Sequence, residues 1–140
     1  MRVVNDKEVL MSRKVMKPTD AELEILQILW EMGPGTVRQV NDELNRIRKI
    51  GYTTTLKMMQ IMLDKGMLSR NEDQRSHLYS ALLKEKETQN LLLNKLVASA
   101  FGGSALKLVV SALGNGKTSR NELAKIKNFI DAIESRRGDE

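Results

Sequence analysis

Several side chains that can hydrogen bond to the base edges of a nucleic acid are gathered in residues 52–66. Three consecutive threonines and Lys57 lie in the first half of this stretch, and no acidic residue occurs before Asp64. A helix that presents hydroxyl and amine groups on one face can lie in the major groove of DNA. An ordinary amphipathic helix with a solvated polar face fits the same spacing. The outward face would comprise Thr54, Lys57, Met58, Ile61 and Lys65.

Residues 52–66 carry the signals of a single helix. The hydroxyl groups at its start can accept the backbone N–H groups of the first helical turn. Gly66 stands where a C-terminal cap would end the helix. An apolar stripe at helical spacing, which neighbouring elements must cover, comprises Leu56, Met59 and Leu63.

Two more helices are predicted before this stretch. Thr19 and Glu22 have the spacing of a capping box, so the first helix begins near residue 20 and ends at the Gly33-Pro34-Gly35 turn. We expect Trp30 to lie in the core because it closes an apolar stripe. Thr36 can cap the second helix. The apolar face of that helix comprises Val37, Val40 and Leu44.

A short basic cluster, Arg46, Arg48 and Lys49, lies between the second helix and residues 52–66. A cluster between two helices is usually a solvated turn. Its position beside the candidate recognition helix also fits contact of Arg48 and Lys49 with DNA phosphates. The sequence leaves both interpretations open.

A β-hairpin is predicted between residues 67 and 82. Two extended runs flank the polar turn 71–76. Leu68 on the first arm, with Leu78 and as a further candidate Tyr79 on the second, would face inward. Three helices followed by a hairpin with basic residues form a winged helix-turn-helix, whose wing touches the DNA backbone or minor groove. The basic residues on or beside the tip are Arg70, Arg75 and His77.

The composition excludes several classes of function. The chain of 140 residues has no cysteine and a single histidine, which rules out disulfides, thiol catalysis and a multi-histidine metal site. No carboxylate pair, triad or phosphate loop indicates an enzyme, and we expect neither a metal nor a cofactor. No apolar run is long enough for a membrane span, and the first residues do not form a signal peptide, so we expect a cytoplasmic protein.

Net charge favours a polyanionic partner only weakly. The chain has a formal charge of +5. The excess is spread over both halves, with 13 basic and 11 acidic residues in 1–82 and 10 and 7 in 83–140. A nucleic-acid interpretation must therefore rest on where the charges lie.

Residues 83–136 are predicted to form three helices with wide apolar faces. Phe101-Gly102-Gly103 breaks the first helix, Ser104 caps the second, and Gly114-Asn115-Gly116 ends it. Ser119 and Glu122 form a capping box for the third. So few helices cannot bury such faces alone, and a second copy of the chain is the simplest cover. Packing back onto the first domain in a monomer is the alternative.

The chain is therefore expected to be mainly α. We predict a flexible N-terminal extension (1–16), a winged-helix DNA-binding domain (17–82), a helical dimerisation domain (83–136) and a disordered tail (137–140).

Five motifs in order resemble the penicillinase and methicillin-resistance repressors of the BlaI/MecI type, and the resemblance covers about residues 17–135. They are Pro18–Leu26 with Leu29-Trp30, Gly51–Leu56, Lys65–Leu68, Arg75–Tyr79 and Phe101–Ser104.

This resemblance implies a homodimeric transcriptional repressor that binds an inverted-repeat operator in double-stranded DNA. The C-terminal helices of the two chains would interlock. The wing and neighbouring basic residues would hold phosphates. The residues that would read the major groove are, by position, Thr53, Thr54, Thr55, Lys57, Met58 and Ile61.

The antibiotic-responsive members of that family are cut at an Asn-Phe bond in the dimerisation segment, on a signal from a membrane metalloprotease sensor. The aligned segment here, near Leu108–Ala112, has no Asn-Phe pair, and its nearest match is Ser111-Ala112. Relief of repression by proteolysis is therefore an open expectation. The copper-responsive relatives bind metal through C-terminal cysteines, which this chain lacks.

Two other functions remain open at this point. One is a MarR-like regulator that binds a small ligand, although no cluster of polar groups on an apolar cleft is evident. The other is a winged-helix protein-interaction module that does not bind DNA, for which no salt-dependent binding to duplex DNA would be expected.

Overall fold

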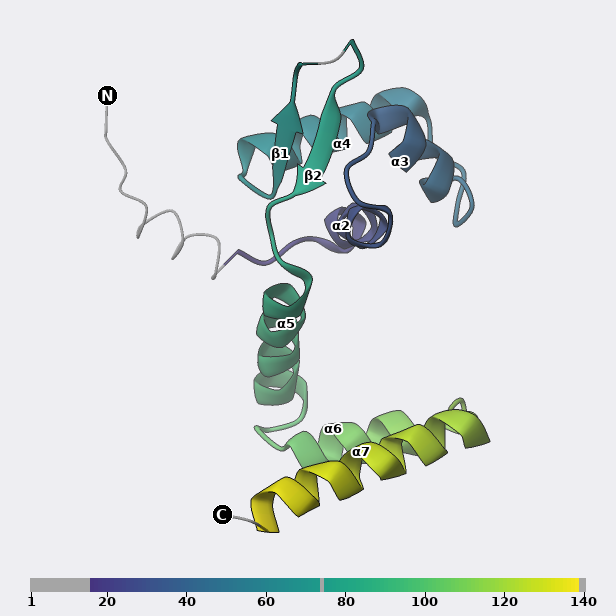
Figure 1. Ribbon diagram of the computed structural model, residues 1–140, viewed down its shortest axis with the longest axis vertical. Coiled ribbons are helices and arrows are strands. Elements are labelled where there is room, and N and C mark those ends of the chain that lie inside the picture. Colours follow the sequence, from purple (N-terminus) through teal and green to yellow (C-terminus); the bar gives the residue numbers. More distant parts are fainter. Residues whose placement is uncertain (1–15, 74, 139–140) are drawn as a thin grey trace, which may run out of the picture. The chain divides into compact units, whose positions relative to one another are not determined.

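The computed structural model of the chain describes residues 16–73 and 75–138 (Figure 1). These form two compact units, the first ending at Asn94 and the second beginning at Lys95. The predicted class, mainly α with a two-stranded wing after three helices, is confirmed. In chain order the elements are α2 (Asp20–Met32), α3 (Val37–Leu44), α4 (Tyr52–Asp64), β1 (Leu68–Asn71), β2 (Leu78–Ala81), α5 (Glu85–Ala100), α6 (Ala105–Gly114) and α7 (Arg120–Gly138).

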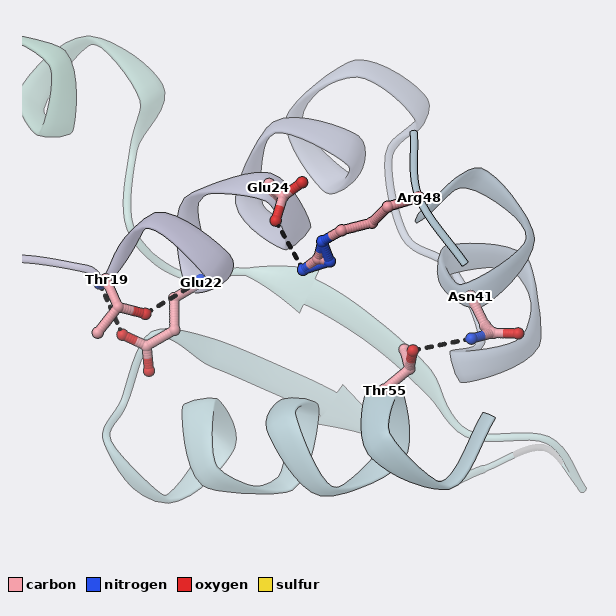
Figure 2. Close-up of polar contacts among 6 residues, drawn as sticks. All are labelled: Thr19, Glu22, Glu24, Asn41, Arg48 and Thr55. Atoms are coloured by element: carbon pink, nitrogen blue, oxygen red, sulfur yellow. Dashed lines mark hydrogen bonds and ion pairs between the residues drawn. The ribbon is translucent and has the colours of Figure 1, made fainter. Parts of the chain in front are cut away.

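Helix α2 begins and ends where its sequence predicts. The side-chain oxygen of Thr19 accepts a hydrogen bond from the backbone N–H of Glu22, and the carboxylate of Glu22 accepts one from the N–H of Thr19 at 2.9 Å (Figure 2). The predicted capping box is therefore confirmed. Gly33 ends the helix with φ of +83°, a conformation that residues with a Cβ rarely adopt.

Helix α4 begins differently from the prediction. Gly51 is its N-cap, and among the described residues no side chain forms a cap hydrogen bond there. The three threonines are already inside the first turn, so the expected hydroxyl cap is wrong. The predicted end is confirmed, because Gly66 has φ of +81° and the N–H of Met67 donates to the carbonyl of Met62 at 2.9 Å.

Strands β1 and β2 form the predicted wing as an antiparallel pair, with Leu68 opposite Ala81. Side chains alternate between the faces of a strand. Leu68 and Tyr79 point to the core and are buried, whereas Leu78 is half-buried, so Tyr79 is the inward residue of the second arm. Backbone hydrogen bonds of 3.0 and 2.8 Å join Tyr79 to Gly35 and fix the wing to the turn after α2.

One hydrophobic core joins α2, α3, α4 and the wing. Trp30, expected in this core, is instead half-buried at its edge. Its indole N–H donates to the carbonyl of Leu83 at 2.8 Å, so the ring is placed where its polar nitrogen finds a partner. The buried core residues are Ile25, Leu26, Leu29, Val37, Val40, Leu44, Met59, Met62, Met67, Leu68, Tyr79 and Leu83.

Residues 95–138 of the second unit form no comparable core. Ser104 caps α6, and the hydroxyl of Ser119 accepts from the N–H of Glu122 at 3.1 Å, as the sequence predicts. Across the described residues of α6 and α7, however, none is buried. Their large exposed apolar side chains are Leu106, Val109, Val110, Leu123, Phe129 and Ile130.

The predicted ends of the fold need two corrections. The N-terminal extension, 1–16, lies outside the described residues except for Met16, which packs against the core. Helix α7 continues to Gly138, so the tail predicted at 137–140 begins too early. The predicted boundary between 82 and 83 stays a prediction; the first unit extends beyond it to Asn94 and includes the buried Thr88.

Candidate nucleic-acid interface

The outward face of α4 contains no acidic side chain before the last turn of the helix. Thr53, Thr54 and Lys57 are exposed, Met58 is half-buried, and Ile61 is 43% exposed. The first acidic residue of the helix is Asp64, in its last turn. This face can therefore approach a polyanion without a repelling carboxylate, and these five residues remain the predicted DNA contacts.

Thr55, predicted to read DNA, is fully buried. Its hydroxyl accepts a hydrogen bond from the side-chain amide of Asn41 on α3 at 2.8 Å (Figure 2). The same hydroxyl donates to the carbonyl of Gly51 at 3.4 Å. A residue in this position cannot reach a base edge. The prediction for Thr55 is therefore wrong, and its role is to join α3 to α4.

The turn between α3 and α4 is held by two asparagines that the sequence reasoning missed. The amide of Asn41 also donates to the carbonyl of Ile50 at 3.1 Å. Asn45 donates to the same carbonyl at 3.0 Å, while its side-chain oxygen accepts from the N–H of Ile50 at 3.2 Å. The sequence contained a signal for the role of Asn41, because this polar residue lies among the apolar positions of α3. These contacts fix the angle at which α4 is presented.

The basic cluster before α4 is partly neutralised within the protein. Arg48 forms an ion pair with Glu24 of α2 at 2.8 Å, as Figure 2 shows. Arg46 pairs with Glu43 at 3.4 Å. Lys49 is exposed and forms no ion pair with the described residues. Of the two predicted phosphate contacts here, Lys49 is thus the more available.

In the wing, as in the cluster before α4, not every basic side chain has a carboxylate partner among the described residues. Arg70 is paired with Glu72, and this contact lowers the pKa of the Glu72 carboxyl below its ordinary value. Arg75 and His77 are exposed near the tip. Neither forms an ion pair with another described residue. Arg75 and His77 are therefore the wing residues most available to phosphate.

A cleft of about 570 Å³ opens between the first turns of α3 and α4 and the return arm of the wing. Its walls include Arg38, Tyr52, Arg75, Ser76 and His77. The guanidinium carbon of Arg38 lies 4.9 Å from the centre of the Tyr52 ring, a cation–π contact. Sequence reasoning missed Arg38 and Tyr52 as a pair, because they belong to different helices.

Lys65, expected on the outward face of α4, instead forms an ion pair with the first turn of α2. Its amine contacts the carboxylate of Glu22 at 2.9 Å. Burial favours the protonated form of Glu22, but hydrogen bonds from Thr19 and Lys65 outweigh it and hold the pKa of this carboxyl below its ordinary value. The ion pair ties the end of α4 to the start of α2.

The remaining predicted positions lie in the second unit. Ser111 and Ala112, the nearest match to a cleavage site, are exposed on α6. Within the part of the chain that the structure describes, no group of three or more His, Asp or Glu side chains could hold a metal ion. No single described helix is long and apolar enough to cross a membrane; α5 and α6 reach such a length only when taken together across their break.

Comparison with known proteins gives a consistent set of relatives. The penicillinase repressor family model matches residues 18–132. The chain is 20% identical over 125 residues to the penicillinase repressor of Bacillus licheniformis, covering 89% of this chain and 98% of that protein. It is 27% identical over 121 residues to the transcriptional regulator BlaI of Mycobacterium tuberculosis, covering 86% and 76%.

A solved structure of the DNA-binding domain of the repressor BlaI also matches. It covers 51% of this chain and 93% of that domain, with 25% identity and a TM-score of 0.45.

Proposed function

This chain belongs to the penicillinase repressor family, and we propose that it is a cytoplasmic transcriptional repressor that binds double-stranded DNA. The observation that carries this function is the exposed, acid-free face of α4, which the buried Asn41–Thr55 hydrogen bond holds in place. In a winged helix such a helix enters the major groove. Lys57 would bond to a guanine edge, and the methyl groups of Thr53, Thr54 and Met58 would contact thymine methyls.

The phosphate contacts come from the exposed basic residues that flank α4. Lys49 precedes the helix, and Arg75 and His77 lie on the wing. Arg48 and Arg70 already have carboxylate partners, Glu24 and Glu72, so DNA must compete with these ion pairs. We therefore expect Arg48 and Arg70 to contribute less than Lys49 and Arg75.

The protein acts as a homodimer through its C-terminal helices. Phe129 is 62% exposed, Leu106 73% and Val110 60%. Side chains of this size rarely remain in water when a partner surface can cover them. A second copy carries the same apolar faces and would cover them in a symmetric interface.

Dimerisation accounts for recognition of a palindrome. Two copies of α4 would read half-sites about one DNA turn apart, roughly 34 Å. The second half-site binds as an intramolecular event, so the dimer binds far more tightly than one winged helix. Repression follows when the occupied operator blocks transcription.

Selection from a random duplex library, combined with a salt titration, tests this function. Enrichment of a two-half-site palindrome, with affinity falling steeply as salt rises, is the expected result. Binding without enrichment would leave a non-specific DNA-binding protein. The absence of binding at moderate salt would contradict the proposal and favour a protein-interaction module.

Cleavage of the dimerisation segment would relieve repression without altering the DNA-reading face. No Asn-Phe pair lies near Ser111-Ala112, but one occurs in α7, at Asn128-Phe129. A recognition site for a sequence-specific protease, inserted between α6 and α7, tests whether cutting the dimerisation segment releases the DNA. This test does not depend on which bond is cut naturally. Cleavage should weaken operator binding greatly, and unchanged affinity after complete cleavage would exclude this mode of relief. A membrane metalloprotease sensor would be the natural source of the signal.

A further inference from the structure

The cleft beside α4 is separate from the face that would read DNA bases. Its walls come from three elements: Arg38 on α3, Tyr52 on α4, and Arg75 with Ser76 and His77 on the wing. No acidic side chain lines it among the described residues. The cleft thus brings together two guanidinium groups and several neutral hydrogen-bonding groups.

Arg38 differs from the two arginines in the turn that follows α3. Arg46 and Arg48 each contact a carboxylate, whereas Arg38 forms no ion pair with the described residues. It lies 4.9 Å over the ring of Tyr52 instead. Stacking on a ring restrains the planar guanidinium while leaving its N–H groups free to donate.

These groups match one kind of ligand. Guanidinium and hydroxyl groups around an open, acid-free cleft bind anionic oxygen, and phosphate suits the two-pronged geometry of arginine. The cleft shares Tyr52 and Leu56 with α4, so DNA held by the outer face of this helix passes near it. An open cleft at the helix start also admits a continuous polymer backbone more readily than a pocket closed on all sides.

We infer that this cleft seats a backbone phosphodiester of the bound DNA, with Arg38 stacked on Tyr52 holding it from α3 and Arg75 holding it from the wing. This inference rests on the proposed function and adds a contact from α3 that flanking residues alone do not supply. Phosphate contacts carry no sequence information and fix the position of a protein along the duplex. The Arg38–Tyr52 pair would therefore set the depth and register of α4 in the groove.

The salt dependence of binding by Arg38→Gln in the full-length protein tests the inference. Each lost phosphate contact lowers the slope of log affinity against log salt by about 0.9, so a dimer should lose about 1.8. Affinity should fall roughly tenfold or more for operator and unrelated duplex alike. Arg46→Gln is the matched control, because Arg46 is equally a solvent-facing arginine but does not line the cleft. Circular dichroism and thermal unfolding verify that both variants fold.

The outcomes separate this inference from the proposed function. If the wild-type protein selects an operator but Arg38→Gln keeps its affinity and salt slope, the cleft does not hold DNA and the inference is overturned. Failure of the wild-type protein to bind duplex DNA would instead remove the proposed function. If inorganic phosphate, exchanged for chloride at equal ionic strength, abolished the difference between wild type and Arg38→Gln, the cleft would be a site for free phosphate.

Substitution of Tyr52 tests the stacking itself. Tyr52→Phe keeps the ring under Arg38 and should bind operator within about twofold of wild type, whereas Tyr52→Leu removes it and should lose roughly two- to fivefold. The Tyr52→Leu loss should disappear in an Arg38→Gln background, because the ring acts through Arg38. Equal losses in both backgrounds would contradict the role assigned to the stack.

Discussion

The two units of this protein use similar amphipathic helices in opposite ways. In the first, Ile25, Leu26 and Met59 are fully buried within a single chain. In the second, the apolar residues of α6 and α7 are exposed or half-buried, and no residue of either helix, as far as the structure describes them, is buried. A helical pattern in the sequence thus predicts an apolar face without telling whether the same chain covers it. The first unit has the features of an independent fold, and the proposed dimer would supply the surface that covers the second.

The largest effect is expected from substitutions that prevent the second unit from dimerising. Phe129→Asp together with Ile130→Asp places charges on an exposed apolar face of α7. Operator affinity should fall by about 100-fold or more, because the two half-sites are no longer bound as one event. Electrophoretic mobility shift with the selected operator measures this loss. Asn121→Asp adds a charge to the same helix without removing apolar surface and should bind normally; equal losses would point to charge alone.

Truncation of one leucine in each unit should affect the two units in different ways. Leu26→Ala in α2 should destabilise the first unit by about 2–5 kcal/mol, because it leaves a cavity in a core that the chain covers by itself. Leu106→Ala in α6 should instead weaken the dimer, so that the two chains dissociate at a lower denaturant concentration. Chemical denaturation at several protein concentrations distinguishes them. A concentration-independent loss of stability for Leu106→Ala would contradict the assignment of α6 to an interface between chains.

A smaller effect is expected from the polar bond inside the first unit. Thr55→Val removes the partner of a buried Asn41 amide and should cost about 1–3 kcal/mol of stability. Asn41→Leu combined with Thr55→Val should cost less than the two single changes together, since neither buried group is then left unpaired. Additive losses in urea denaturation would mean that the two residues do not act as a pair. Thr53→Val, an exposed neighbour, is the stability control.

The smallest effect concerns pH. The pKa of Glu22 lies below its ordinary value of 4.5 in the folded protein. The unfolded chain therefore binds a proton at higher pH than the folded chain, so this stabilisation is present above 4.5 and is lost as pH falls through the folded pKa. With Lys65 half-exposed, the contribution should not exceed about 1 kcal/mol. Thermal unfolding of Glu22→Gln should lose part of the acid sensitivity of wild type; an identical pH profile would exclude the pair as its source.

Local signals predicted most of the first unit. The capping residues Thr19, Thr36 and Gly66 set the helix limits, and two extended runs around a polar turn predicted the wing. The burial of Thr55 was missed because three adjacent threonines are chemically alike and the start of the helix decides which one turns inward. With Tyr52 as the first helical residue, the fully buried positions are Thr55, Met59 and Met62, a stripe rotated from the predicted one.

Contacts between distant residues could not be predicted in this way. Arg48 meets Glu24, and Arg38 meets Tyr52, only because the helices are packed together. The sequence therefore placed Thr53, Thr54 and Lys57 on a solvent-exposed helix face, but it could not show which arginines are already partnered. That this face contacts DNA stays a prediction. The wide apolar faces after residue 83 were visible in the sequence, and their exposure in the structure is what motivates the dimer.

The most direct test of this account is the mass of the complex formed by the full-length protein on its selected operator, measured by native mass spectrometry over a titration. If the protein binds as a dimer, two chains of 15.8 kDa should appear together on each duplex, and an isolated half-site should be bound far more weakly. One chain per duplex, with equal affinity for operator and half-site, would contradict it.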